Sequence, residues 1–178
     1  MDSQRLFLAA LNVLGGVAVL GSYAYGIATH TSPGEALWGG VPASLRPLYQ
    51  ASMLAAAVGY LLFTYQLIFV VKPEEAATFA GLGYAGFNLL YLLILIPSTL
   101  WMSLTFSYVA QPSALGWALL RGVLFAVAAG AIGMLIATAR LSGVLHRGSL
   151  AVGVLGAALF ALHTTVLDAI VWPIYFRR

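Results

Sequence analysis

The sequence predicts an all-α integral membrane protein, a bundle of five transmembrane helices with short loops and one longer loop between the first two helices. Of its 178 residues, 62% are hydrophobic and only 7% are charged, and its mean hydropathy is +0.97. Soluble domains carry roughly a quarter charged residues, so this chain lacks the charge to cover a surface in water. One bilayer crossing needs about twenty apolar residues. The length therefore predicts five crossings in a single transmembrane domain, residues 1–178, with no room for a soluble domain.

The first helix is predicted over residues 6–28, an apolar run that follows a short polar start. A signal peptide would have a shorter apolar core and a more positive start, so we expect this segment to remain in the mature protein. Residues 31–47 then contain three prolines, three glycines and Trp38. This composition predicts the longest loop, lying at the membrane interface and able to act as a lid.

The other four helices are predicted from further apolar runs over residues 48–71, 78–108, 115–139 and 149–175. Lys72 and Pro73 end the first of these runs, because proline cannot continue a helix and favours the start of a new one. Pro97 lies inside the next run, which is longer than a perpendicular crossing needs. We therefore expect a kink or a tilt there.

Small residues recur at four-residue intervals in three of these runs, and such faces let helices approach closely in lipid. They are Ala51, Ala55 and Gly59; Gly122, Ala126 and Gly130; and Gly153, Ala157 and Ala161. Packing inside the bundle is the first interpretation, and a homodimer face is the alternative.

An odd number of crossings places the two termini on opposite sides of the membrane. Basic residues divide between the sides as Arg5, Lys72, Arg140 and Arg147 with the N-terminus, and Arg46, Arg177 and Arg178 with the C-terminus. Cytoplasmic segments carry an excess of Lys and Arg, so this slight difference predicts a multi-pass protein with a cytoplasmic N-terminus and an external C-terminus.

The composition also excludes several classes of chemistry. The chain has no cysteine, which rules out disulfides, thiolate metal sites and iron–sulfur clusters. Its net charge of +3 comes from scattered residues, which is not the clustered basic patch of a nucleic-acid-binding protein. Asp168 is the single carboxylate within the predicted helices, so we expect no metal site and no paired-carboxylate catalysis.

Two charges are predicted at matching depth in the membrane. At about 1.5 Å per residue, Arg121 lies about 9 Å along the fourth helix, and Asp168 lies about 10 Å from the same face in the fifth. An unpaired charge in a bilayer costs a few kcal/mol, so we expect these two side chains to form an ion pair. A static clamp, a snorkelling arginine and a proton-linked or ligand-gated bridge are the alternative interpretations.

His163 is the one histidine within a predicted helix, near the middle of the bilayer. It lies about 140° round an α-helix from Asp168, so direct contact between the two is not expected. A hydrogen-bonded core histidine, a ligand-binding or proton-relay residue and a haem ligand are three interpretations. We expect no cofactor, with haem b held by His163 as the alternative.

Polar and aromatic residues at helical spacing predict an interior cavity able to hold a ligand. The candidate ligand-binding residues are Arg121, Asp168, His163, Asn88, Tyr60, Tyr91, Trp101 and Trp172. The charged residues would anchor a polar group, His163 with Asn88 would orient it, and the aromatic rings would stack on it. Ordinary hydrogen bonding between helices is the competing interpretation of the same residues.

These features favour a small polytopic protein that binds or translocates a small amphipathic or lipophilic molecule, and that is not an enzyme. A membrane enzyme acting on a lipid-like substrate, with His163 as general base, is one alternative. A non-catalytic structural subunit of a membrane complex is another. The expected partners are the lipid bilayer, the small ligand and either a second copy or another membrane chain.

Overall fold

The computed structural model describes residues 2–76, 81–143 and 146–176, and every regular element in these ranges is helical. Five of the described helices are long and apolar enough to cross a membrane, namely Ser3–Thr29, Arg46–Val70, Ala85–Ala110, Ala114–Ala139 and Arg147–Phe176. This confirms the predicted helical class and is compatible with a multi-pass membrane protein. The helix predicted over residues 78–108 begins later, at Ala85, and ends at Ala110; the preceding residues 81–84 are not α-helical, with Gly81 and Gly83 at positive φ. Residues 78–80 of the predicted helix lie outside the described residues.

The elements follow one another with short connections. They are α1 (Ser3–Thr29), α2 (Pro33–Trp38), α3 (Arg46–Tyr65), η1 (Gln66–Val70), η2 (Pro73–Glu75), α4 (Ala85–Ala110), α5 (Ala114–Ala139), η4 (Arg140–Gly143), α6 (Arg147–Leu162), η5 (His163–Val171) and α7 (Trp172–Phe176). The second and fifth long helices therefore each change from α-helix to π-helix, in η1 and η5. η2 and η4 are single 3₁₀ turns.

Capping side chains begin two of the long helices. The Asp2 carboxylate accepts hydrogen bonds from the backbone N–H groups of Gln4 and Arg5, at 2.8 and 3.2 Å. The Ser113 hydroxyl accepts one from Gly116, at 3.0 Å. These bonds satisfy N–H groups that have no partner within the first turn of a helix.

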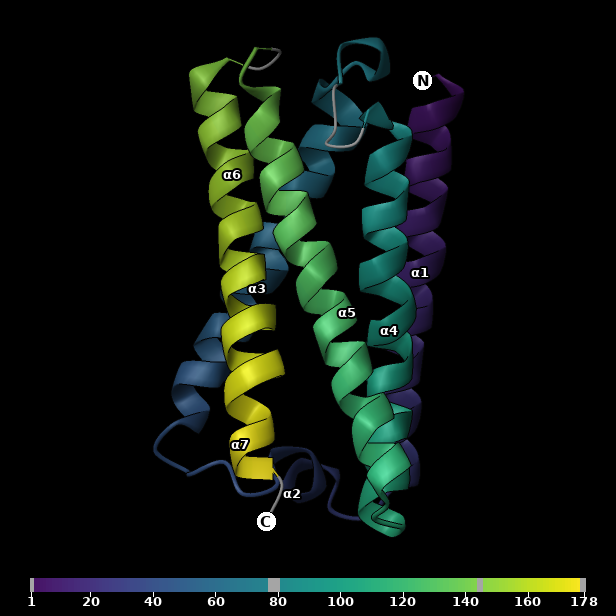
Figure 1. The fold of residues 1–178 in the computed structure, drawn as a ribbon, viewed down its shortest axis with the longest axis vertical. Helices are drawn as coiled ribbons and strands as arrows, with labels where there is room; N and C mark the ends of the chain where they lie inside the picture. Colours follow the sequence, from purple (N-terminus) through teal and green to yellow (C-terminus); the bar gives the residue numbers. More distant parts are fainter. Residues whose placement is uncertain (1, 77–80, 144–145, 177–178) are drawn as a thin grey trace.

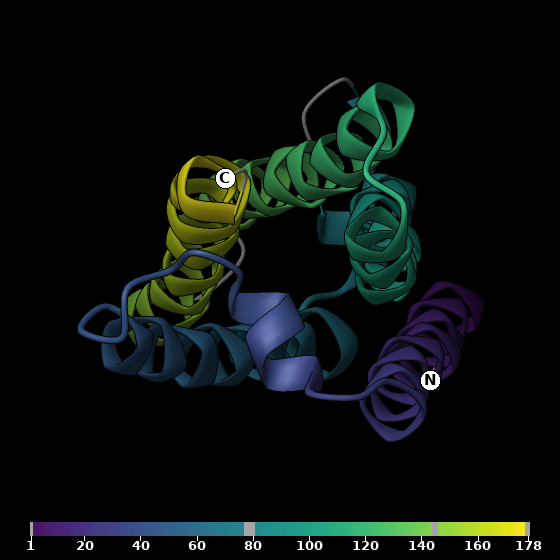
Figure 2. The same cartoon turned by 90° about the horizontal axis from the view of Figure 1, so that it is seen from below.

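The long helices form a ring in which neighbours in space are not always neighbours in sequence (Figures 1 and 2). α1 packs on α4, α4 on α5, α5 on α6 and η5, and α6 on α3. α3 returns to α1 mainly through η1, at the end of the bundle where the chain starts. At the opposite end, α2 lies across the mouth of the ring (Figure 2).

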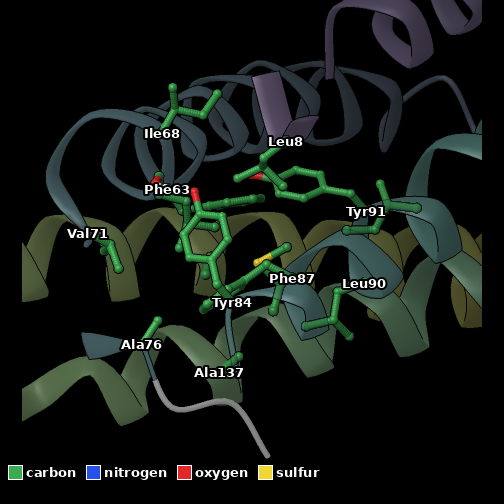
Figure 3. Packing of buried hydrophobic residues seen from close by; sticks show 14 of the residues in the cluster. Leu8, Phe63, Ile68, Val71, Ala76, Tyr84, Phe87, Leu90, Tyr91 and Ala137 are labelled. Carbon is green, nitrogen blue, oxygen red and sulfur yellow. Dashed lines mark hydrogen bonds between the residues drawn. The ribbon is translucent and has the colours of Figure 1, made fainter. Parts of the chain in front are cut away.

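Two hydrophobic clusters fill the two ends of the bundle. The first lies at the end where the chain starts and joins α1, α3, η1, α4 and α5, with Leu8, Phe63, Phe87 and Tyr91 all fully buried (Figure 3). The second lies at the α2 end and is rich in aromatic side chains, including Tyr49, Trp117, Trp172 and Phe176. Tryptophan concentrates at membrane interfaces.

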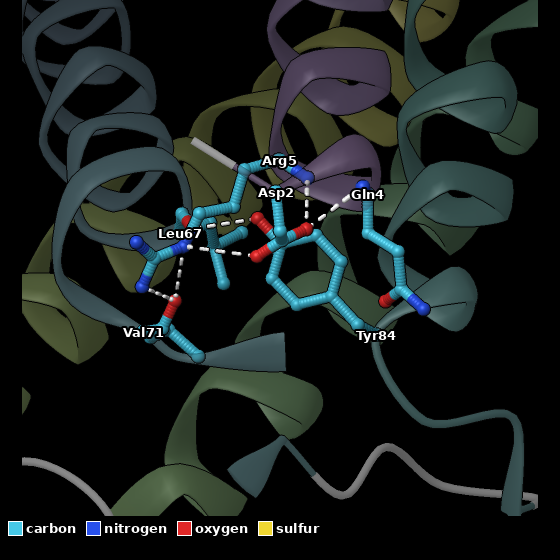
Figure 4. Close-up of polar contacts among 6 residues, drawn as sticks. All are labelled: Asp2, Gln4, Arg5, Leu67, Val71 and Tyr84. Carbon is cyan, nitrogen blue, oxygen red and sulfur yellow. Dashed lines mark hydrogen bonds and ion pairs between the residues drawn. The ribbon is translucent and has the colours of Figure 1, made fainter. Parts of the chain in front are cut away.

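A polar cluster joins α1, η1 and α4 near the start of the chain (Figure 4). The Arg5 guanidinium donates hydrogen bonds to the Val71 carbonyl, one of them 2.9 Å long, just past the end of η1. The Tyr84 hydroxyl donates to the Leu67 carbonyl at 2.6 Å. Burial raises the pKa of Tyr84 to about 12, because an apolar surrounding disfavours the phenolate. These bonds satisfy carbonyls that the end of a helix leaves open.

The segment predicted as the longest loop contains a short helix, α2, and is held firmly against the bundle. Gly39 ends α2 with a φ of +52°, and a Cβ there would come within 2.5 Å of the Phe176 ring. The Trp172 indole donates a hydrogen bond to the Leu37 carbonyl at 2.9 Å. Trp38 meets Tyr49 edge to face, with ring centroids 5.8 Å apart. These contacts tie α2 to α3 and α7.

Candidate functional site

Antiparallel packing of α3 against α6 and η5 positions the candidate site. Three contacts follow one another at seven-residue intervals along this seam: Ser52 with His163, Gly59 with Gly156, and Gln66 with Ser149. A repeat of seven keeps the same faces of two helices together. At the central contact, a Cβ on Gly59 would lie 2.3 Å from the Gly156 carbonyl oxygen. The two glycines therefore let the backbones touch, which brings the flanking polar side chains within hydrogen-bonding distance.

The predicted small-residue faces are confirmed in part. Gly59, Gly130 and Gly153 each lie directly against a neighbouring helix, and Ala157 and Ala161 are buried. Gly122 instead faces open space, with no other atom within 4 Å of where a Cβ would lie.

His163 connects a serine to the carboxylate at the centre of the candidate site. Its Nδ1 lies 3.0 Å from the Ser52 hydroxyl, and its Nε2 lies 3.4 Å from an Asp168 carboxylate oxygen. The imidazole is nearly buried, whereas 35% of the Asp168 side chain stays accessible. The three side chains form a continuous series of polar contacts that ends in a partly accessible carboxylate.

The contact between His163 and Asp168 overturns the expectation that the two do not meet. That expectation assumed an α-helix, but His163 is the first residue of the π-helix η5, which extends to Val171. A π-helix bonds residues five apart, as the Trp172 N–H does with the Leu167 carbonyl. This winding brings side chains five positions apart onto one side of the helix. Interruptions of this kind are frequent at functional sites.

Asp168 lies on the inner side of the bundle, among three helices. The hydroxyl groups of Tyr23, from α1, and Tyr49, from α3, both lie within electrostatic range of its carboxylate. The Tyr49 hydroxyl donates a hydrogen bond to the Leu167 carbonyl at 3.1 Å, which holds α3 against η5 beside the carboxylate. Asp168 is the only acidic residue within the five long helices.

The predicted ion pair between Arg121 and Asp168 is wrong. Among the side chains that the structure describes, Asp168 pairs with His163, and Arg121 has no acidic partner. The Arg121 guanidinium instead lies over the Phe125 ring, 5.0 Å from its centroid. It also lines a crevice with Ile170 and Ile174. The depth of the two charges matches, but their directions do not, since Ile170 faces outward and Asp168, two residues earlier, faces inward.

The two tyrosines of the predicted cavity use their hydroxyls in bonds between helices. The Tyr91 hydroxyl lies 2.7 Å from that of Thr64 and is fully buried. The Tyr60 hydroxyl donates to the Asn12 side-chain oxygen at 2.5 Å, which joins α3 to α1. Asn88 has a buried side-chain oxygen without a hydrogen-bond partner in the described structure. No described contact brings Asn88 to His163, so these residues lie apart from Asp168.

The two predicted tryptophans do lie together, in a row of aromatic rings that crosses the bundle beside Asp168. The Tyr23 and Trp101 centroids are 5.7 Å apart, and those of Trp101 and Trp172 are 6.1 Å apart. The Trp101 indole N–H is buried and has no hydrogen-bond partner among the described atoms. Aromatic faces next to a carboxylate form the surroundings in which proteins bind organic cations.

The sequence predictions omitted Ser52 as the partner of His163, and Tyr23 and Tyr49 as neighbours of the carboxylate. A signal for Ser52 was present, because Ser52, Gly59 and Gln66 repeat at seven-residue intervals, as do Ser149, Gly156 and His163. Two such series in different helices predict a common seam. The π-helix leaves no comparable signal in the sequence.

Both ring nitrogens of His163 already have polar partners, and a haem iron would have to displace one of them. Axial ligation would require the imidazole to give up either Ser52 or Asp168.

A comparison of the chain with models of known protein families, with curated proteins and with solved structures finds no match.

Proposed function

We propose that the protein binds, or passes across a membrane, a small amphipathic or lipophilic molecule whose positively charged group is held by Asp168. The observation that supports this is that no described residue supplies a permanent counter-charge at Asp168. Its ion-pair partner among the described side chains is a histidine, which carries a charge only when it is protonated. A carboxylate at membrane depth is costly when it is ionised and alone. A proton or a cationic ligand would remove that cost.

The surroundings favour an organic cation over a small inorganic ion. Tyr23, Trp101 and Trp172 present aromatic rings beside the carboxylate, and such rings attract cations that carry apolar groups. Coordination of a hard metal ion takes six or more oxygen ligands. The described part of the chain contains no cluster of three acidic or histidine side chains for such a site.

Two probes of the same shape and opposite charge test this proposal. Tetraphenylphosphonium is a lipophilic cation, and tetraphenylborate is the matching anion. In detergent, the cation is expected to raise the melting temperature of the wild-type protein, and the anion is not. Asp168→Asn removes the charge with little change in size, and Glu35→Gln, at an exposed position of α2, removes one as the control. Equal stabilisation of wild type and Asp168→Asn by the cation would refute the proposal.

A specific observation favours one second candidate, an acyl-transfer enzyme that acts on a lipid-like substrate. Ser52, His163 and Asp168 form a serine–histidine–aspartate chain with contacts of 3.0 and 3.4 Å, the combination that activates a serine nucleophile. Such an enzyme also needs hydrogen-bond donors that stabilise the negative charge on the oxygen of the reacting carbonyl group. Ser52 lies in the second turn of α3, where the backbone N–H groups already donate within the helix and so do not supply this stabilisation.

Covalent labelling distinguishes the two functions. A fluorophosphonate probe reacts with an activated serine, so the enzyme predicts labelling of wild type and none of Ser52→Ala. Ser103→Ala, at an exposed position of α4, is the matched control. Absence of labelling, together with cation binding that needs Asp168 and survives Ser52→Ala, would leave the binding protein as the explanation.

A further inference from the structure

A crevice on the outside of the bundle places an arginine among apolar side chains. It has a volume of about 230 Å³, lies where α5 packs against η5, and is also lined by residues of α7. Its lining residues are Trp117, Arg121, Ile170, Pro173 and Ile174. The isoleucines that form one wall are exposed to 49% and 67%, so in a bilayer this wall faces lipid chains.

The Arg121 guanidinium is only partly satisfied in the crevice. One of its faces lies over the Phe125 ring, and its buried Nε has no hydrogen-bond partner among the described groups. The described chain also offers it no acidic side chain. A charged group at membrane depth is tolerated when it is paired. Within the described residues, Arg121 thus has room for an anion that reaches the crevice from outside the chain.

The height of the crevice matches the boundary between lipid headgroups and chains. Arg121 lies seven residues after Ala114, the first residue of α5, which corresponds to about 10 Å along the helix. Trp117 lies one turn closer to that end, and Trp38 and Trp172 belong to α2 and α7 at the same end (Figure 1). Tryptophans gather at the membrane interface. Arg121 lies one helical turn deeper in the membrane than Trp117, and from that depth a long arginine side chain can reach a headgroup phosphate.

We propose that this crevice binds an anionic membrane lipid, with the headgroup phosphate on Arg121 and an acyl chain along Ile170 and Ile174. A guanidinium matches a phosphate with two parallel hydrogen bonds. A free phosphate would use the arginine but leave the apolar wall without a partner. The amphipathic lining therefore points to a lipid. This site faces outward and is separate from Asp168.

Lipid retention in native mass spectrometry tests the proposal. The delipidated protein is incubated with phosphatidylglycerol or with phosphatidylcholine that has the same acyl chains. Wild type is expected to retain the anionic lipid preferentially, and Arg121→Gln to retain it about tenfold less, as expected for loss of charge-assisted hydrogen bonds. Arg140→Gln removes the same charge from the exposed far end of α5 and is expected to have a much smaller effect.

A second variant and a soluble ligand test the crevice independently of Arg121→Gln. Ile174→Trp fills the crevice while keeping the arginine, so it is expected to lower retention even if Arg121→Gln fails to fold. Glycerol phosphate, the soluble headgroup, is expected to bind much more weakly than the lipid. Unchanged retention in both crevice variants, or equal binding of glycerol phosphate and the lipid, would overturn the proposal. Asp168→Asn is expected to retain the lipid as wild type does, which separates this test from that of the proposed function.

Discussion

The contact between Gly59 and Gly156 is the tightest backbone approach along the seam that holds the candidate site, and it supports a quantitative prediction for Gly59→Ala. An ideal Cβ on Gly59 lies 2.3 Å from the Gly156 carbonyl oxygen, and ordinary contact begins at 3.4 Å, so the backbones would have to separate by about 1.1 Å. The clashing atom belongs to the backbone, so no change of side-chain rotamer relieves it.

The expected loss of stability follows from two opposing terms. Overpacking a tight contact costs about 1–3 kcal/mol, while replacing glycine by alanine within a helix regains up to about 1 kcal/mol. We therefore expect Gly59→Ala to lower the free energy of unfolding by about 1–2 kcal/mol. Separation of the helices also lengthens the contact of Ser52 with His163 two turns away.

Reversible unfolding in mixed micelles, with increasing mole fraction of dodecyl sulfate, measures this loss through helical circular dichroism. Gly122→Ala is the matched control, because a Cβ there meets no other atom within 4 Å; it is expected to be neutral or slightly stabilising. Gly156→Ala is expected to match Gly59→Ala, and the double variant to cost less than the sum, because both relieve one contact. If Gly59→Ala is as stable as Gly122→Ala, the close approach of α3 and α6 is refuted.

Three other predictions concern single hydrogen bonds. Tyr84 has a pKa of about 12 in the folded protein because it is buried, against about 10 when unfolded, so wild type is expected to lose stability as the pH rises from 10 to 12. Tyr84→Phe is expected to lose less stability than wild type over this range, and parallel pH profiles for the two proteins would contradict the burial argument. Trp172→Phe removes the bond to the Leu37 carbonyl and is expected to speed hydrogen exchange in α2 while that in α4 stays unchanged; equal exchange in wild type and variant would show that this bond does not hold α2. Tyr60→Phe breaks the bond to Asn12 and is expected to cost about 0.5–1 kcal/mol in the same micelle assay, and no measurable loss would mean that α1 and α3 are held by packing alone.

The predicted pair of Arg121 with Asp168 and the contact of His163 with Asp168 show what the position of a residue along its helix can predict and what it cannot. Arg121 and Asp168 were matched in depth from residue counting, and counting gives the height of a side chain above the end of its helix. It does not give the direction in which the side chain points. In the structure, Arg121 lies in an outer crevice beside Ile170, while the Asp168 carboxylate lies within range of Tyr23 on the inner side.

The contact of His163 with Asp168 was missed for a related reason. An angle of 100° per residue separates these positions on an α-helix, and η5 is wound differently. The change of winding depends on packing around the helix, with α3 and α5 both in contact with η5. Of the eight candidate residues, the structure places Asp168 with His163 and Trp101 with Trp172 on one side, and Tyr60 with Tyr91 in a separate group.

The sequence by itself determined the helical class, the five long apolar helices and the few polar residues within them that need partners. These properties depend on composition and on the length of apolar runs, which a single chain carries without reference to its neighbours. The tertiary structure alone decided the partners: Asp168 with His163, Ser52 across the glycine seam, and Arg121 facing outward. Partners depend on the rotation of each helix about its own axis, and that rotation is set by packing between helices.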